Sequence, residues 1–149
     1  DTDKTSNALD AAAGTAEGGR DVKKAEDAIN RWMVIIPAAA EQDVCLLHCW
    51  PEETISLKDM QKIVEGYIET VPLLLPDSMS GEENVKLLMI VNEEGKLMGL
   101  PRNREASILS AADGIVGNAI IAGARGEEII GLREEAALEI KKAVREWNG

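Results

Sequence analysis

The sequence predicts a single α+β domain, with a largely antiparallel sheet of hairpins and about three packed helices. Apolar runs typical of short strands alternate irregularly with helical patterns, whereas a parallel sheet would need repeated strand-helix units. A chain of 149 residues is long enough to bury a core. Hydrophobic residues make up 45% of it but aromatic residues only 3%, so we expect that core to be aliphatic.

The N-terminal region divides into two parts. Residues 1–20 are rich in Ala, Gly, Thr and Asp without apolar periodicity, which predicts a flexible tail or linker. From Asp21, apolar residues recur at helical spacing and predict a short helix that leans on the domain; they are Val22, Ala25, Ile29 and Trp32. We therefore expect the single domain to span residues 21–149. Because the chain opens with Asp1 rather than Met, we expect it to derive from a longer product.

The first half of the domain predicts a hairpin followed by a helix. Residues 32–36 and 44–50 are apolar runs separated by a Pro-containing stretch, which is typical of a hairpin with a long loop. Ser56 is an expected helix N-cap, with Asp59 three residues later, and Gly66 is expected to end the helix. The inner face of this helix is expected to comprise Leu57, Met60, Ile63, Val64 and Tyr67.

Two strands are expected next. Residues 67–75 are apolar and β-branched, and Pro72 places them at a sheet edge. A polar, Gly-containing loop follows over residues 76–84. Residues 85–91 then predict an interior strand.

The sequence next predicts a second hairpin and a helix. Residues 92–95 form a turn into a short strand, 96–99, with Gly95 at the position that needs positive φ. Asn103 predicts an N-cap for a helix that runs through about Ala111.

The last third predicts a pair of strands and the clearest helix of the chain. The strands are expected over residues 114–123 and 128–132. Residues 133–147 predict an amphipathic helix whose apolar stripe comprises Ala136, Ala137, Ile140, Val144 and Trp147.

Charge excludes several classes of partner. A formal net charge of −11 repels phosphate, which argues against general binding of nucleic acids or anionic membranes. No run approaches the roughly 18 apolar residues of a membrane helix, and the N-terminus lacks the pattern of a secretory signal. The two cysteines make no disulfide framework, so we expect a cytoplasmic protein.

The residues that most often carry chemistry do not form a catalytic pattern. Cys45, His48 and Cys49 lie in a predicted strand, where His48 faces opposite to both cysteines. The two cysteines would be about 13 Å apart, too far for a disulfide or a shared metal ion. No glycine-rich phosphate fingerprint is present. We therefore expect no enzyme, no metal and no cofactor.

Basic residues gather at one predicted helix start. Arg102 and Arg104 flank it, where the helix dipole favours anions and disfavours cations. Two explanations stay open: an anion bound among the backbone N–H groups and guanidiniums, or internal pairing with carboxylates such as Glu65 and Glu69. Internal pairing is favoured, because an Arg in an acidic chain usually has a carboxylate nearby.

Two stretches of the chain carry a resemblance to a known family. Residues 57–69, followed by 91–96 and 99–104, resemble the uncharacterised family called domain of unknown function 3846, which occurs in bacteriophages and bacterial mobile elements. The resemblance covers about residues 31–132 and implies a mobile-element setting without an established activity. Family members often carry a Gly-Gly pair where this chain has Glu65-Gly66. The recurrent family positions correspond here to Gly66, Glu69, Asn92, Gly95, Gly99, Pro101, Asn103 and Arg104.

These observations lead to one functional hypothesis and one alternative. We expect a small acidic accessory protein of a phage or mobile element that binds a protein partner and does not catalyse a reaction. The alternative is a binder of a small anionic ligand at Lys96 and the helix start. The acidic exterior also raises the option of DNA imitation toward a host protein. The candidate binding residues are Asn92, Lys96, Arg102, Asn103, Arg104 and Glu69.

Overall fold

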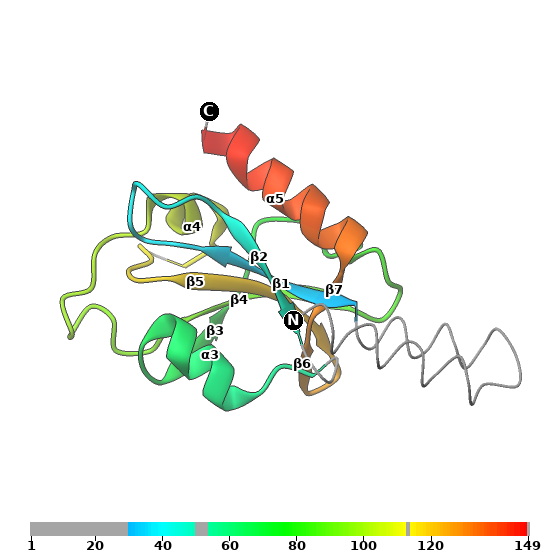
Figure 1. Cartoon of the computed structure of the whole chain (residues 1–149), viewed down its shortest axis with the longest axis horizontal. Helices are drawn as coiled ribbons and strands as arrows, with labels where there is room; N and C mark the ends of the chain where they lie inside the picture. The colour runs from blue at the N-terminus through cyan, green and yellow to red at the C-terminus, as the bar shows by residue number, and fades with distance from the viewer. Residues whose placement is uncertain (1–29, 50–53, 113, 149) are drawn as a thin grey trace, which may run out of the picture.

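The computed structural model confirms the predicted α+β class: an antiparallel sheet carries helices on both faces (Figure 1). The predicted tail over residues 1–20 and the helix beginning at Asp21 lie outside the described part of the chain. Trp32, which the sequence placed on that helix as well as in the following strand, belongs to the strand. The residues that the structure describes are 30–49, 54–112 and 114–148.

The sheet follows the order β2-β1-β5-β4-β3, and every neighbouring pair is antiparallel. The predicted hairpin of β1 and β2 is confirmed, as is the edge position of β3, which ends before Pro72. Two shorter strands lie off this path, since β6 pairs with β5 and β7 pairs with β1. The bounds are β1 Arg31–Ile36, β2 Cys45–Cys49, β3 Ile68–Val71, β4 Lys86–Asn92, β5 Ala119–Arg125, β6 Glu128–Ile130 and β7 Leu132–Arg133.

The two faces of the sheet are covered unequally. Helices α4 (Arg104–Leu109) and α5 (Glu134–Asn148) lie on one face, and α3 (Leu57–Val64) is the one described helix on the other, below the sheet in Figure 1. A short 3₁₀ helix, η1 (Asp77–Ser80), precedes β4. The larger core, under α4 and α5, includes Val34, Ile36, Met89, Leu109, Ile121 and Ile140. The smaller core, under α3, includes Met33, Ile35, Met60, Val64, Ile90 and Ile120.

Helix α5 matches its predicted stripe as far as the side chains are described. The four apolar positions from its first turn onward are buried and join the larger core; they are Ala136, Ala137, Ile140 and Val144. The fifth predicted position, Trp147, lies outside the described side chains. The stripe faces the sheet because helical spacing of three and four residues keeps these positions on one side.

Helix α3 begins as predicted but ends one residue earlier than Gly66. The Ser56 hydroxyl accepts a hydrogen bond from the Asp59 N–H at 3.1 Å, which confirms the N-cap. Glu65, and not Gly66, adopts the left-handed conformation that ends the helix, with φ of 68°. Two residues expected on the inner face are exposed, Leu57 by 54% and Tyr67 by 65%. Leu57 lies in the first turn, and Tyr67 follows the end of the helix, so neither reaches the sheet.

The predicted strand over residues 96–99 is wrong, because this segment folds into successive turns. The N–H of Met98 donates to the Glu94 carbonyl at 2.9 Å, and the N–H of Leu100 donates to the Gly95 carbonyl at 3.0 Å. These local bonds use the groups that a hairpin would need for pairing across strands. Positive φ occurs at Gly99 (69°) and not at Gly95.

The expected strand over residues 114–123 starts later than predicted. Gly114 and Gly117 both have positive φ, at 65° and 76°, and this interrupts the extended backbone. Strand β5 therefore begins at Ala119, although its pairing with β6 is as predicted. Before that strand, the chain forms a single bridge between Arg102 and Val116.

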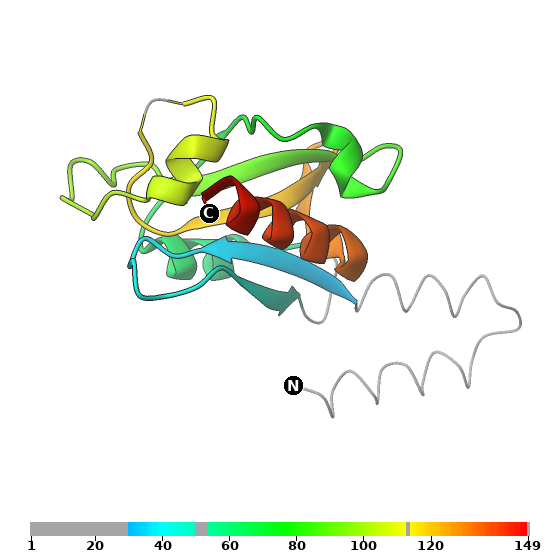
Figure 2. The ribbon, with the colours of Figure 1, turned by 90° about the horizontal axis from the view of Figure 1, so that it is seen from above.

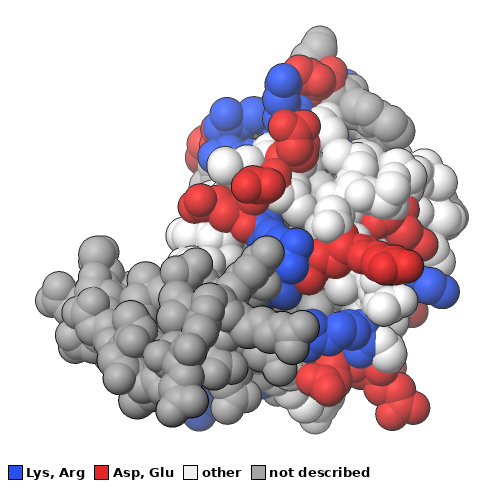
Figure 3. Space-filling view, turned by 90° about the vertical axis from the view of Figure 1, so that its right-hand side faces the viewer, with Lys and Arg blue, Asp and Glu red and all other residues white. Residues whose placement is uncertain are grey.

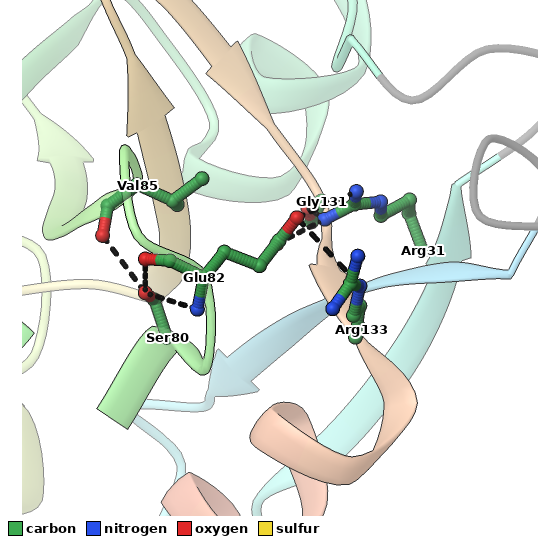
Figure 4. Close-up of polar contacts among 6 residues, drawn as sticks. All are labelled: Arg31, Ser80, Glu82, Val85, Gly131 and Arg133. Carbon is green, nitrogen blue, oxygen red and sulfur yellow. Dashed lines mark hydrogen bonds and ion pairs between the residues drawn. The ribbon is translucent and has the colours of Figure 1, made fainter. Parts of the chain in front are cut away.

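A buried ion network ties the start of β1 to the loop after η1 and to β7 (Figure 4). The Arg31 guanidinium donates from both terminal nitrogens to the Glu82 carboxylate, and the distance from Nη2 to Oε1 is 2.9 Å. Its Nη1 also donates to the Gly131 carbonyl. Arg133 Nε lies 3.6 Å from the same carboxylate. Only 2% of Arg31 is exposed. Glu82 thus pairs with a cation that is buried inside the fold.

Candidate functional site

A hollow of about 700 Å³ lies between β2 and α3, on the face of the sheet that α3 covers. We call it the α3 groove. Its apolar surface comes from the strands, the connection before α3 and the helix itself: Met33, Leu47, Cys49, Ile55 and Ile63. A hollow of this size, with an apolar floor and a few polar groups, is typical of ligand and peptide sites.

The groove exists because α3 is too short and too narrow to cover its face of the sheet. Eight residues make a helix about 12 Å long and about 10 Å wide, whereas five strands span about 19 Å. The helix packs against β3, β4 and β5, so that, of the helices the structure describes, none lies over this face of β1 and β2. Met33 and Leu47, paired across those two strands, line the groove there. Leu47 is 45% exposed.

Polar side chains form the rim of the groove. Along α3 and its end lie Asp59, Lys62 and Glu65, all exposed. At one end Thr54 donates a hydrogen bond to the Glu128 carboxylate at 2.9 Å. The lining therefore holds two carboxylates against one ammonium group, and Glu128, bonded to Thr54, places a further carboxylate next to it. The charge of this region is negative.

Asn118 fixes the groove wall. Its amide nitrogen donates to the Ile63 carbonyl at 3.1 Å, and its amide oxygen accepts from the Ala38 N–H at 3.1 Å. The side chain thereby links the last turn of α3 to the loop between β1 and β2. This connection holds the helix and the strands at a set separation.

The cysteine and histidine residues are placed as strand geometry predicted. Cys49 belongs to the core under α3, whereas the His48 ring lies against Trp32, on the other side of the sheet, with ring centroids 4.7 Å apart. Burial raises the pKa of the Cys49 thiol to about 12, so the thiol is neutral at physiological pH and contributes apolar surface. Among the described residues, no group of three or more His, Cys, Asp or Glu is arranged to hold a metal.

Glu65, on this rim, has an unfavourable backbone conformation, with positive φ. It is the one described residue other than Gly with positive φ. Side chains with a Cβ are disfavoured in this conformation, and Gly is the usual residue there. Glu65, which carries a Cβ in this conformation, therefore strains the helix end at the groove. Such strain is often found at functional sites.

We expect Glu65→Gly to raise the free energy of unfolding by about 0.5–1 kcal/mol, because it relieves the left-handed strain. Urea denaturation followed by circular dichroism measures the change. The matched control is Lys62→Gly in the last turn of α3, where the backbone is helical, and this should lower stability by about 1 kcal/mol. Equal losses at both positions would show that Glu65 is not strained.

Two of the predicted binding residues are structural. Asn92 is buried, and its amide nitrogen donates to the Val64 carbonyl at 2.9 Å while its oxygen accepts from the Glu94 N–H. A Cβ on Gly66 would lie 2.7 Å from that nitrogen, so Gly66 permits the close approach. Asn103 is the confirmed N-cap of α4 and is also buried. Both amides are used inside the protein and present little to a ligand.

The other four predicted residues do not come together as one site. Glu69 and Lys96 line a smaller hollow of about 240 Å³, together with Asn92, Glu93 and Glu94. Its carboxylates outnumber its one ammonium group, which disfavours an anion. Arg102 and Arg104 are exposed and do not line that hollow.

The expected pairing of the arginines with Glu65 or Glu69 is not present. Within the described part of the chain, the side chains of Arg102 and Arg104 have no ion pair. Helix α4 has only six residues, so its N-terminus offers a weak dipole. The small-anion alternative stays a prediction that no observation of this region favours.

The sequence reasoning missed the α3 groove. Leu47 and Ile63 were assigned to a strand and to a helix face, and neither pattern indicates how far the helix extends over the sheet. One signal was available: Glu65 precedes Gly66 at the predicted end of the helix, and it lies on the groove rim.

The family profile described as "Domain of unknown function (DUF3846)" matches residues 49–145, from the end of β2 to within α5. This is well over half of the chain. The protein belongs to this family of unknown function. The matched segment lies further along the chain than the expected 31–132, since it omits β1 and includes most of α5. No curated protein and no solved structure matched the chain.

The family match covers α3 and all of β3 to β7, so the helical wall of the groove lies inside it. Strand β1 and most of β2, which form the opposite wall, lie outside it. None of the described helices has the length and apolar character that a bilayer crossing requires.

Proposed function

We propose that this protein of the DUF3846 family is an accessory protein of a phage or mobile element that binds a protein partner in the α3 groove without catalysing a reaction. The observation that carries the proposal is the groove itself, a hollow of about 700 Å³ with an apolar floor and a charged rim. Apolar hollows framed by polar groups are a common form of protein-binding and ligand-binding surface. The mobile-element setting rests on the family resemblance.

A binding role is supported by the chemistry of the groove. The Cys49 thiol lines the groove, and burial keeps that thiol protonated. The rim carboxylates Asp59 and Glu65 are exposed, so water stabilises their charge. The proposal includes a cytoplasmic location, supported by the unpaired thiols of Cys45 and Cys49.

A protein partner is favoured over a nucleic acid because of charge. The chain carries −11, which repels a phosphate backbone. On the face seen in Figure 3, acidic and basic residues are interspersed, and neither sign forms a continuous field. DNA imitation, which needs a continuous acidic surface, receives no support from this face.

Affinity purification from a host lysate tests the proposal with four forms of the protein. Leu47→Asp places a charge in the apolar part of the groove, and Leu97→Asp does the same at an exposed leucine outside it, which is 86% exposed. Arg102→Glu/Arg104→Glu reverses the basic surface. We expect one protein to be recovered by the wild type, by Leu97→Asp and by the arginine variant, and to be lost with Leu47→Asp.

Two outcomes would contradict the proposal. Loss of the recovered protein only with the arginine variant would move the binding surface to the start of α4. Recovery of nothing above background by the wild type would remove the binding function itself. Melting curves of all four forms establish that each variant is folded, since both leucines are substantially exposed and tolerate a polar side chain.

A further inference from the structure

Strand β2 forms the margin of the sheet beside the α3 groove. It pairs with β1 on one side, and no second strand pairs with it in the parts of the chain that the structure describes. Figure 2, which views the molecule from above, shows β2 as the outermost strand of the sheet. Such an edge presents backbone N–H and C=O groups to which another extended chain can pair.

The two edges of the sheet differ in their protection. Residues of β2 include no Lys, Arg, Asp, Glu or Pro, and the strand exposes Cys45 and Leu47. At the opposite edge, β3 exposes Glu69 and is followed by Pro72. Charges and Pro are the usual means of preventing pairing at an edge. Of these two strands, only β3 carries an acidic or basic residue of this kind within the strand itself, Glu69.

A strand added beside β2 would place its side chains at the groove. Alternate residues of a strand point to opposite faces of the sheet, and Leu47 and Cys49 point to the face of α3. Every second side chain of an added strand would therefore enter the groove, beside Leu47 and Ile63. Addition of a strand at a sheet edge is an established mode of peptide recognition.

Charge selects the kind of peptide. Asp59 and Glu65 line the groove against Lys62, and Glu128 lies next to it through its hydrogen bond with Thr54. The whole chain carries −11. A peptide with Lys or Arg near its aliphatic residues is attracted by this surface, and an acidic peptide is repelled. A second copy of this chain, which carries the same negative charge, is disfavoured on the same ground.

We propose that the partner binds as an extended, basic peptide segment that pairs with β2 and inserts aliphatic side chains into the α3 groove. This inference rests on the proposed function, because it assigns the partner's form and charge at the same groove. The backbone pairing involves β2 from Cys45 to Leu47. Affinity comes from main-chain hydrogen bonds, and selectivity comes from the groove floor and its carboxylates.

Selection of 12-residue peptides from a displayed random library, with the full chain as bait, supplies the probe. We expect selected peptides to alternate aliphatic residues with other residues and to carry Lys or Arg. A selected peptide is then synthesised with its backbone N-methylated at even positions or at odd positions. One of the two forms should lose binding and the other should keep it, because alternate N–H groups of a strand face opposite edges.

Amide hydrogen exchange measured on the complex locates the pairing. Protection of β2 amides from Cys45 to Leu47 on peptide addition supports strand addition. Three results would overturn strand addition. The first is loss of binding by both N-methylated forms, which is expected of a peptide that binds as a helix. The second is protection of β2 that depends on protein concentration without peptide, which is expected of a second copy, and the third is that no peptide is selected. In the last case, affinity purification from lysate still decides the proposed function independently.

Charge variants at Glu65 test the basic preference. Glu65→Lys is expected to weaken binding of a selected basic peptide about tenfold, and Glu65→Gln should have a smaller effect in the same direction. Both variants retain a Cβ in the left-handed backbone, so their strain is matched to that of the wild type. Equal affinity for all three forms would show that the rim charge does not select the peptide.

Discussion

Glu82→Gln is expected to lower the free energy of unfolding by about 3–5 kcal/mol. The substitution keeps the shape of the side chain but removes a carboxylate charge that is paired with the buried guanidinium of Arg31. Removing one partner of a buried ion pair is far more destabilising than removing one partner of a surface pair. Urea denaturation followed by circular dichroism gives the change in free energy.

Two comparison variants separate the ion network from general effects of the substitution. Glu83→Gln changes the adjacent, exposed glutamate and should alter stability by less than about 0.5 kcal/mol. Arg31→Met/Glu82→Leu replaces both buried charges by apolar groups and should recover most of the loss. Arg133 can then turn to water, because its side chain is 43% exposed. Similar losses for Glu82→Gln and Glu83→Gln would contradict the role of the network.

Asn103→Ala is expected to lower the free energy of unfolding by about 2–4 kcal/mol. The Asn103 oxygen caps α4 by accepting from the Ala106 N–H at 3.0 Å. Its nitrogen donates to two buried carbonyls, those of Ile36 at 2.8 Å and Gly117 at 2.9 Å. One side chain thereby joins the end of β1, the start of α4 and the segment before β5. Thermal and urea denaturation measure the loss.

Asn103→Asp distinguishes the cap from the two donated hydrogen bonds. Asp is as good an N-cap as Asn, but its carboxylate cannot donate to the Ile36 and Gly117 carbonyls and repels both oxygens. We expect Asn103→Asp to be at least as destabilising as Asn103→Ala at neutral pH. Full stability in the Asp variant would assign the role of Asn103 to the cap alone. Asn84→Ala, at an exposed position, is the control.

These two residues also illustrate what sequence patterns do not contain. Asn103 was recognised as a helix cap, because capping depends on residues three positions apart. Its bonds to Ile36 and Gly117 join segments far apart in the chain, and no local pattern records them. The buried pair of Arg31 and Glu82 is separated by 51 positions and was not predicted.

The errors in the fold have the same origin. Residues 96–99 were predicted as a strand because a turn precedes them, but the Asn92 side chain and successive backbone bonds fold them into turns. Helix α3 was predicted to end at Gly66, whereas Glu65 adopts the left-handed conformation. Gly66 is needed for another reason, the close approach of Asn92 from the end of β4.

The amino-acid order alone determined the α+β class, the hairpin of β1 and β2, the caps of α3 and α4, and the apolar stripe of α5. Each depends on residues near one another in the chain, through alternation, helical spacing or capping. Only the tertiary structure decided which carboxylate balances Arg31, why Arg102 and Arg104 share no hollow with Lys96, and where the α3 groove lies. The groove results from the width of the sheet relative to one short helix. That relation exists only after strands from distant parts of the chain have paired.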